Sequence, residues 1–165
     1  MKLIVCSKRE ASNFESDVSW CAIQVKTFES EPHAKISGVK RVDLLQLNFP
    51  DADSIEFTSS SLSEDEINEL KKNMFSDKHA DQVIDFYLNN KDKCDVLMVH
   101  CLAGRCRSPA IAASLSKIET GEDSLYFKNY TPNSHVYNTI LSRAFERGLL
   151  DKVFDKKEIK GTFNF

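Results

Sequence analysis

Residues 100–109, with the sequence HCLAGRCRSP, place a potential nucleophile and a permanent cation a few residues apart. The thiolate of a cysteine such as Cys101 is the reactive form of that side chain. The guanidinium of Arg107 stays protonated and offers a planar fork of N–H donors, which matches two oxygens of a phosphoryl group. Gly104 allows the backbone between them to bend so that successive N–H groups converge on one anion. Residues of these types at this spacing are suited to chemistry on phosphate.

The elements on either side of this segment are expected to hold it in shape. Residues 95–99 are almost wholly apolar and rich in β-formers, which predicts a buried central strand. Ser108 is a good N-cap, Pro109 fits the first helical position, and the small apolar residues after it continue a packed helix. The unpaired N–H groups at the start of that helix would bind an anion and lower the pKa of Cys101.

The string HCLAGRCRS resembles the pattern of the cysteine-dependent protein tyrosine and dual-specificity phosphatases, in which His-Cys is followed by five residues and then Arg-Ser or Arg-Thr. It is most similar to the form found in small single-domain members, such as those of bacteria and phages. The resemblance implies that Cys101 forms a phosphocysteine intermediate, that Arg107 clamps the phosphate, and that the Ser108 hydroxyl bonds the sulfur and helps it to leave. It also implies that His100 supports a low cysteine pKa through hydrogen bonds around the loop. The residues implied to bind the phosphate are Leu102, Ala103, Gly104, Arg105, Cys106 and Arg107.

Two of these residues have simpler interpretations. The simpler role of Ser108 is to cap the helix, and this role is compatible with the first. A lone histidine such as His100 at the end of a strand is often a core residue whose hydrogen bonds are satisfied. Arg105 adds a second positive charge, which suits a multiply phosphorylated ligand or is simply solvated.

A leaving alkoxide or phenolate also needs a proton donor, and the family resemblance implies an aspartic acid on a separate loop. Asp51 and Asp53 follow a strand-like segment, residues 42–47, in a turn that begins at Pro50. Asp51 is the preferred general acid and Asp53 the alternative. Asp43 lies within the strand pattern and is a poorer candidate. The simpler interpretation is that Pro50 and Asp51 are ordinary turn residues.

Cys106 stands where this loop type usually has serine. One hypothesis is that oxidation joins it to Cys101 and protects the nucleophile from irreversible over-oxidation. The alternative is a serine-sized replacement packed under the loop.

Composition sets limits on the kind of protein. The 165 residues suit one domain over 1–165, and a net charge of -3 gives no general attraction to nucleic acid or to anionic membranes. The five cysteines are odd in number and lack zinc-ligand spacing, which favours a reducing compartment. The histidines outside the loop give no metal pattern, so neither a metal nor a cofactor is expected. Without a secretory or membrane-spanning segment, the expected location is cytoplasmic.

Hydrophobic periodicity predicts strands alternating with helices. Strands are expected at residues 3–6, 20–25, 39–47 and 95–99. Ser63 and Glu66 form a capping box for a helix, a second helix ends at Asn89 and Asn90, Gly121 closes the helix after the loop, and Asn133 or Ser134 opens a last one. Residues 54–62 are expected to form a surface loop. This alternation predicts a single-domain α/β fold with a central, mostly parallel sheet flanked by helices, similar to protein tyrosine phosphatases.

The predicted function is hydrolysis of phosphate monoesters, and the expected substrates are phosphotyrosine, and also phosphoserine or phosphothreonine, of a protein or peptide. Three alternatives stay open. The loop could bind phosphorylated ligands without turnover, as in a pseudophosphatase; it could act on a phosphoinositide or a nucleic-acid end; or it could support another thiol-based oxyanion reaction, such as arsenate reduction. The sequence makes no prediction of oligomeric state.

Overall fold

The computed structural model describes residues 1–51 and 63–150. Within these ranges one sheet contains β1 (Lys2–Ser7), β2 (Trp20–Lys26), β3 (Arg41–Asn48) and β4 (Val96–Cys101). The strand order is β1-β4-β2-β3, and each neighbouring pair is parallel. Every residue of β4 is buried, as expected for a central strand covered on both faces. The predicted α/β fold with a parallel sheet is confirmed.

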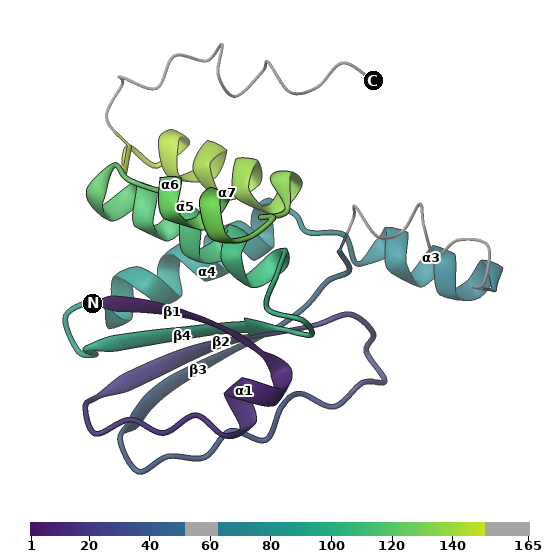
Figure 1. The fold of residues 1–165 in the computed structure, drawn as a ribbon. Coiled ribbons are helices and arrows are strands. Elements are labelled where there is room, and N and C mark those ends of the chain that lie inside the picture. Colours follow the sequence, from purple (N-terminus) through teal and green to yellow (C-terminus); the bar gives the residue numbers. More distant parts are fainter. Residues whose placement is uncertain (52–62, 151–165) are drawn as a thin grey trace.

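The helices divide between the two faces of the sheet. They are α1 (Lys8–Ser12), α3 (Glu64–Lys72), α4 (Asp77–Asn90), α5 (Arg107–Thr120), α6 (Ser124–Asn129) and α7 (Ser134–Glu146). Helices α4, α5 and α7 cover one face with α6 beside α5, α1 lies on the opposite face, and α3 stands to one side (Figure 1). Among the described residues, no helix is both long and apolar enough to span a membrane.

Strand alternation supplies a separate core to each face. Along β2, Cys21 and Ile23 join the large core under α4, α5 and α7, whereas Trp20 and Ala22 join a smaller core on the side of α1. The same alternation along β4 puts Cys101 in the larger core. His100, one residue earlier, must therefore point to the opposite face.

Most predicted helix ends are confirmed. Ser63 and Glu66 form the capping box of α3, and Gly121 ends α5 in the left-handed conformation, with a φ of 77°. The side chain of Asn133 caps α7 by accepting from the N–H of Val136. Local side-chain and backbone chemistry is enough to specify these ends.

The starts of two elements differ from the predictions, and one helix was not expected. β3 begins at Arg41 rather than at Val39, because the chain turns there and the Arg41 N–H donates to the Gly38 carbonyl. Helix α6 was not predicted. Helix α5 begins at Arg107 with Cys106 as its cap residue, so the prediction of Ser108 as N-cap and Pro109 as first helical residue was wrong. The predicted loop at 54–62 and the alternative acid Asp53 lie outside the described residues.

Candidate active site

The loop between β4 and α5 is held tightly against the end of β1. Gly104 has a φ of 69°, and a Cβ placed on it would lie 2.7 Å from the backbone carbon of Cys6 and from the backbone nitrogen of Ser7. Glycine is required there on both counts, because other residues disfavour a positive φ and no space exists for a side chain. The N–H of Lys8 also donates to the Leu102 carbonyl at 3.1 Å.

The connection between α6 and α7 holds the other side of the loop. The N–H of Thr131 donates to the Arg105 carbonyl at 3.1 Å, and the N–H of Asn133 donates to the Cys106 carbonyl at 3.0 Å. These carbonyls are therefore turned outward from the curve of the loop. On the inner side, the N–H groups of Gly104 and Ser108 bond the Cys101 sulfur, as expected of a loop whose N–H groups attract an anion.

Cys101 is the last residue of β4 and is 3% exposed. Its Sγ lies 3.2 Å from the Oγ of Ser108. Burial by itself favours the neutral thiol, but the hydroxyl and N–H of Ser108 bond the sulfur and favour the thiolate. The charge of Arg107 and the N–H of Gly104 act in the same direction, so the pKa of Cys101 lies below its usual value.

Ser108 reaches the sulfur because α5 begins one residue before it. The side chain of Ser108 is completely buried against the Cys101 sulfur, and Cys106 occupies the cap position of α5. The Ser108 hydroxyl therefore contacts the sulfur, and Ser108 is not the N-cap residue of α5.

Arg107 is 5% exposed and is held by neutral oxygen acceptors from the ends of β2 and β3. Its Nη1 donates to the carbonyl of Phe49 at 2.8 Å, to the hydroxyl of Thr27 at 3.0 Å and to the carbonyl of Lys26 at 3.4 Å. Its Nε is buried without a partner among the described residues. No carboxylate bonds this guanidinium in the described part of the chain, so its positive charge stays available to an anion.

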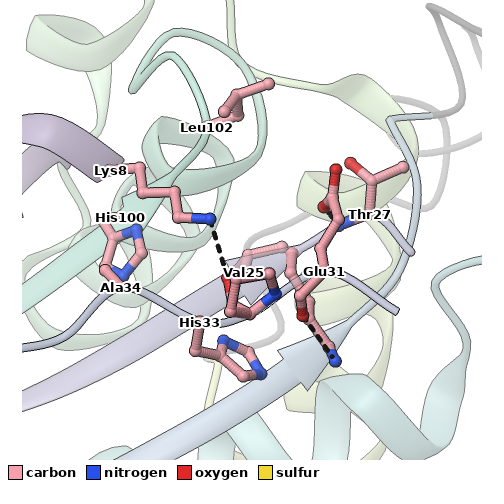
Figure 2. A pocket seen from close by; sticks show the side chains of 10 residues that line it. Lys8, Val25, Thr27, Glu31, His33, Ala34, His100 and Leu102 are labelled. Atoms are coloured by element: carbon pink, nitrogen blue, oxygen red, sulfur yellow. Dashed lines mark hydrogen bonds between the residues drawn. The ribbon is translucent and has the colours of Figure 1, made fainter. Parts of the chain in front are cut away.

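His100 lies on the other side of the sheet, in a small pocket shared with Lys8, His33, Ala34 and Leu102 (Figure 2). Both of its ring nitrogens are buried without a hydrogen-bond partner among the described residues. Burial lowers the pKa of His100 to about 4; the Cys101 backbone opposes this shift, and the charges of His33 and Lys8 add to it. The ring is therefore neutral near pH 7. The predicted hydrogen bonds from His100 around the loop are not found, because strand alternation turns the ring away from the face of Cys101.

Asp51 follows β3 and meets the reactive loop through Asn133. The Nδ2 of Asn133 donates to the Oδ1 of Asp51 at 2.6 Å, while the backbone of Asn133 bonds the Cys106 carbonyl. Two residues before Asp51, the Phe49 carbonyl accepts from Arg107. The segment that contains Asp51 is therefore joined to the reactive loop by two contacts, one from Asp51 through Asn133 and one from Phe49 to Arg107.

The remaining loop residues differ in exposure. Leu102 is 63% exposed, Ala103 and Arg105 are also exposed, and Cys106 is half-buried. None of the five cysteines, all of which lie in the described ranges, is in a disulfide. The described residues contain no cluster of His, Cys, Asp and Glu suited to a metal ion.

Sequence reasoning missed three contributors to this site. It assigned Asn133 only a capping role, and it assigned no role to Thr27 or to the Phe49 carbonyl. A backbone carbonyl leaves no signal in the side-chain sequence. The cap position of Asn133 explains one end of its amide group, and nothing local indicates where the other end points.

No family model and no curated protein sequence matches this chain. Among solved structures, it is similar to the crystal structure of PTPMT1 in complex with PI(5)P, with a TM-score of 0.51 and 12% identity over 88% of this chain and 91% of that chain. It is also similar to human DUSP28, with a TM-score of 0.48 and 14% identity over 88% and 93% of the two chains. For Tk-PTP in its active form the TM-score is 0.45, with 11% identity over 96% and 88%. These neighbours are protein tyrosine and dual-specificity phosphatases, and the likeness to PTPMT1 shows that this chain shares the fold of that protein.

Proposed function

We propose that this protein is a cysteine-dependent phosphatase that hydrolyses phosphate monoesters through a phosphocysteine intermediate. The observation that carries the proposal is the 3.2 Å contact between the Cys101 sulfur and the Ser108 hydroxyl inside a loop whose charges and N–H groups lower the pKa of the thiol. A thiolate held at the start of a helix, beside a buried guanidinium, is poised to attack an electrophile that is itself an anion.

In the proposed first step the Cys101 thiolate attacks phosphorus and the ester P–O bond breaks. The guanidinium of Arg107 and the N–H groups of the loop bind the phosphoryl oxygens as charge moves onto them. Asp51 protonates the leaving oxygen, which matters most when the leaving group is strongly basic. The result is a phosphocysteine and a free alcohol or phenol.

In the second step water attacks the phosphocysteine, and Asp51, now a carboxylate, accepts a proton from it. The S–P bond breaks with its electron pair on sulfur. Ser108 stabilises the departing thiolate because its hydroxyl already lies within hydrogen-bond distance of Sγ. Inorganic phosphate is released and the starting state is restored.

The proposed substrates are phosphotyrosyl proteins or peptides, together with phosphoseryl and phosphothreonyl forms. Arg105 is exposed in the reactive loop and adds a second positive charge, so multiply phosphorylated ligands should be tested as well. A phosphoinositide belongs in the same panel, since the solved structure of PTPMT1 holds PI(5)P.

The decisive experiment measures turnover of p-nitrophenyl phosphate by the reduced protein, with Cys101→Ser beside it. The parent should turn over the ester and, after rapid denaturation at alkaline pH, carry a covalent phosphate on Cys101, whereas the variant should lose turnover and still bind inorganic phosphate. A parent that binds phosphate without turnover would instead identify a pseudophosphatase. Thiol-dependent reduction of arsenate without ester hydrolysis would indicate the other oxyanion chemistry.

A panel of phosphotyrosyl and phosphoseryl peptides, a phosphoinositide, nucleotides and 5′-phosphorylated oligonucleotides then separates the substrate classes. Peptide turnover well above that of the other compounds supports a protein substrate. A preference for the lipid or for the nucleic-acid end would reassign the substrate and leave the phosphatase chemistry in place.

A further inference from the structure

Asn133 is completely buried where the reactive loop, the segment after β3 and the start of α7 meet. Its backbone N–H donates to the Cys106 carbonyl, its Oδ1 accepts from the N–H of Val136 at 2.9 Å, and its Nδ2 donates to the Oδ1 of Asp51 at 2.6 Å. One residue thus connects the reactive loop, a helix end and the proposed general acid.

The helix cap determines which end of the amide faces Asp51. The N–H of Val136 is only a donor, so the atom of Asn133 that meets it must be the carbonyl oxygen. The NH₂ group is therefore left on the side of Asp51. If the Asn133 amide were turned the other way, its oxygen would lie 2.6 Å from the Oδ1 of Asp51, and two acceptors would face each other.

We propose that Asn133 is a positioning residue that directs the acidic proton of Asp51 to Oδ2 and holds that carboxyl group at the reactive loop. A protonated carboxyl group has one hydroxyl oxygen and one carbonyl oxygen. An N–H donor directed at Oδ1 favours the carbonyl form there, which assigns the proton to Oδ2. The inference rests on the proposed function, because it matters only if Asp51 protonates a leaving group.

The same hydrogen bond strengthens as the reaction proceeds. When the S–P bond forms and the ester P–O bond breaks, the electron pair of that bond goes to the ester oxygen, which takes the proton from Oδ2 of Asp51. The carboxyl group becomes a carboxylate, and the bond from Asn133 changes from neutral to charge-assisted. An interaction that is stronger in the transition state than in the ground state raises kcat and leaves substrate binding unchanged.

In the second step the roles reverse. The carboxylate of Asp51 accepts a proton at Oδ2 from the water that attacks phosphorus, while the S–P bond breaks with its electron pair on Cys101. Asn133 holds the same carboxyl geometry in both steps, because its own orientation is fixed by α7 and not by the substrate.

Asn133→Ser is the test variant, since serine caps helices well and its short side chain ends before Asp51. We expect kcat for phenyl phosphate, with its basic leaving group, to fall roughly 10-fold, the effect of one hydrogen bond to a charged group. The kcat/KM for p-nitrophenyl phosphate, which reports phosphocysteine formation and not its hydrolysis, should change by less than about twofold. KM for both esters and inhibition by inorganic phosphate should stay within about twofold, because Arg107 and the loop are intact.

Asn90→Ser is the matched control. Asn90 is another buried asparagine whose Nδ2 bonds a carboxylate, that of Asp43 at 2.9 Å, and it lies in α4 away from the loop. Its loss should lower the thermal midpoint and leave the ratio of the two rate constants unchanged. If Asn133→Ser does not fold, Asn133→Thr carries the test, because threonine also supplies a cap oxygen, lacks the amide donor and adds no charge beside Asp51.

Asp51→Asn and the double variant Asp51→Asn/Asn133→Ser show which proposal is wrong if the expected results are not obtained. If Asn133 acts through Asp51, the double variant should be no slower on phenyl phosphate than Asp51→Asn alone. Additive losses, or equal slowing of both esters by Asn133→Ser, would overturn the role of Asn133 and leave the phosphatase proposal standing. Equal slowing of both esters by Asp51→Asn would overturn the acid assignment and this inference together, and absence of turnover in the parent would overturn the proposed function itself.

Discussion

The hydroxyl of Ser108 and the charge of Arg107 act on Cys101 in the same direction but in different ways. The hydroxyl bonds the sulfur directly at 3.2 Å, whereas the guanidinium acts through its charge while its Nη1 is held by neutral oxygens. A carboxylate partner would have cancelled part of that charge. The arrangement lowers the pKa of the thiol and leaves the guanidinium with the charge that the proposed binding of a dianion needs.

Replacing Ser108 by alanine should make the thiol harder to ionise. We expect alkylation of Cys101 by iodoacetamide at pH 6 to become about 10-fold slower, which corresponds to losing a hydrogen bond of about 1.5 kcal/mol to a charged group. The measurement is the alkylation rate at Cys101 by mass spectrometry in a Cys106→Ser background. Ser114→Ala removes another buried hydroxyl from α5, one that bonds the Ala110 carbonyl, and should leave the rate unchanged. Equal rates in the parent and in Ser108→Ala would show that the hydroxyl does not stabilise the thiolate.

The reactive loop takes its shape from β1 on one side and from the connection between α6 and α7 on the other. Gly104 contacts the backbone at the end of β1, and the carbonyls of Arg105 and Cys106 are bonded by N–H groups from the α6–α7 connection. The start of α5 at Arg107 then sets the direction of Ser108. An isolated peptide with this loop sequence would lack all of these constraints.

Gly104→Ala should therefore damage both stability and activity. A left-handed alanine costs about 1–2 kcal/mol, and its Cβ would also displace the loop from β1. Gly121 has a similar φ of 77°, but a Cβ placed on it would meet no atom within 4 Å. Gly121→Ala should therefore show the conformational cost alone and keep full turnover. Urea unfolding and p-nitrophenyl phosphate hydrolysis of the two variants make the comparison. Equal activity of both would mean that the contact with β1 does not shape the site.

Across the whole molecule, the sheet separates two ionisable groups that are neighbours in sequence. Cys101 faces the layer of α4, α5 and α7, and its pKa is lowered. His100 faces α1, and burial lowers its pKa to about 4, so the ring is neutral above that pH. Burial opposes charge on both faces. On the Cys101 side alone, hydrogen-bond donors and a cation outweigh it.

The buried His100 makes global stability fall in mild acid. In the unfolded chain this residue takes up a proton as the pH falls through about 6.5, whereas in the folded protein it resists until about 4. The unfolded state therefore binds more protons across this window, and folding loses up to about 3 kcal/mol as the pH drops from 6.5 to 4. The free energy of urea unfolding, measured at intervals from pH 7 to 4, should show this loss in the parent.

His100→Asn should flatten that pH dependence, whatever its own effect on stability at pH 7. His33 and His79, whose pKa values are also lowered mainly by burial, remain in both proteins and contribute equally to each curve. Asp81, whose pKa is lowered mainly by a hydrogen bond from Arg143, adds its loss only at lower pH. Parallel curves for parent and variant would show that His100 is not the group responsible.

Much of the fold could be predicted because its signals are local. The apolar run of β4, the capping box at Ser63, the left-handed Gly121 and the cap at Asn133 each depend on a few adjacent residues, and each is confirmed. The beginning of α5 was misplaced because Ser108 and Pro109 form a strong local start signal, whereas tertiary packing uses the Ser108 hydroxyl at the sulfur.

The sequence by itself determined which chemical groups stand on one short segment, since a cysteine, a glycine, an arginine and a serine lie within residues 101–108. Only the tertiary structure decided what surrounds them. Asn133 and Asp51 are 82 residues apart, and Arg107 and the Phe49 carbonyl are 58 apart. Such contacts depend on how parallel strands and their covering helices bring distant segments to one edge of the sheet, and no short-range pattern encodes them.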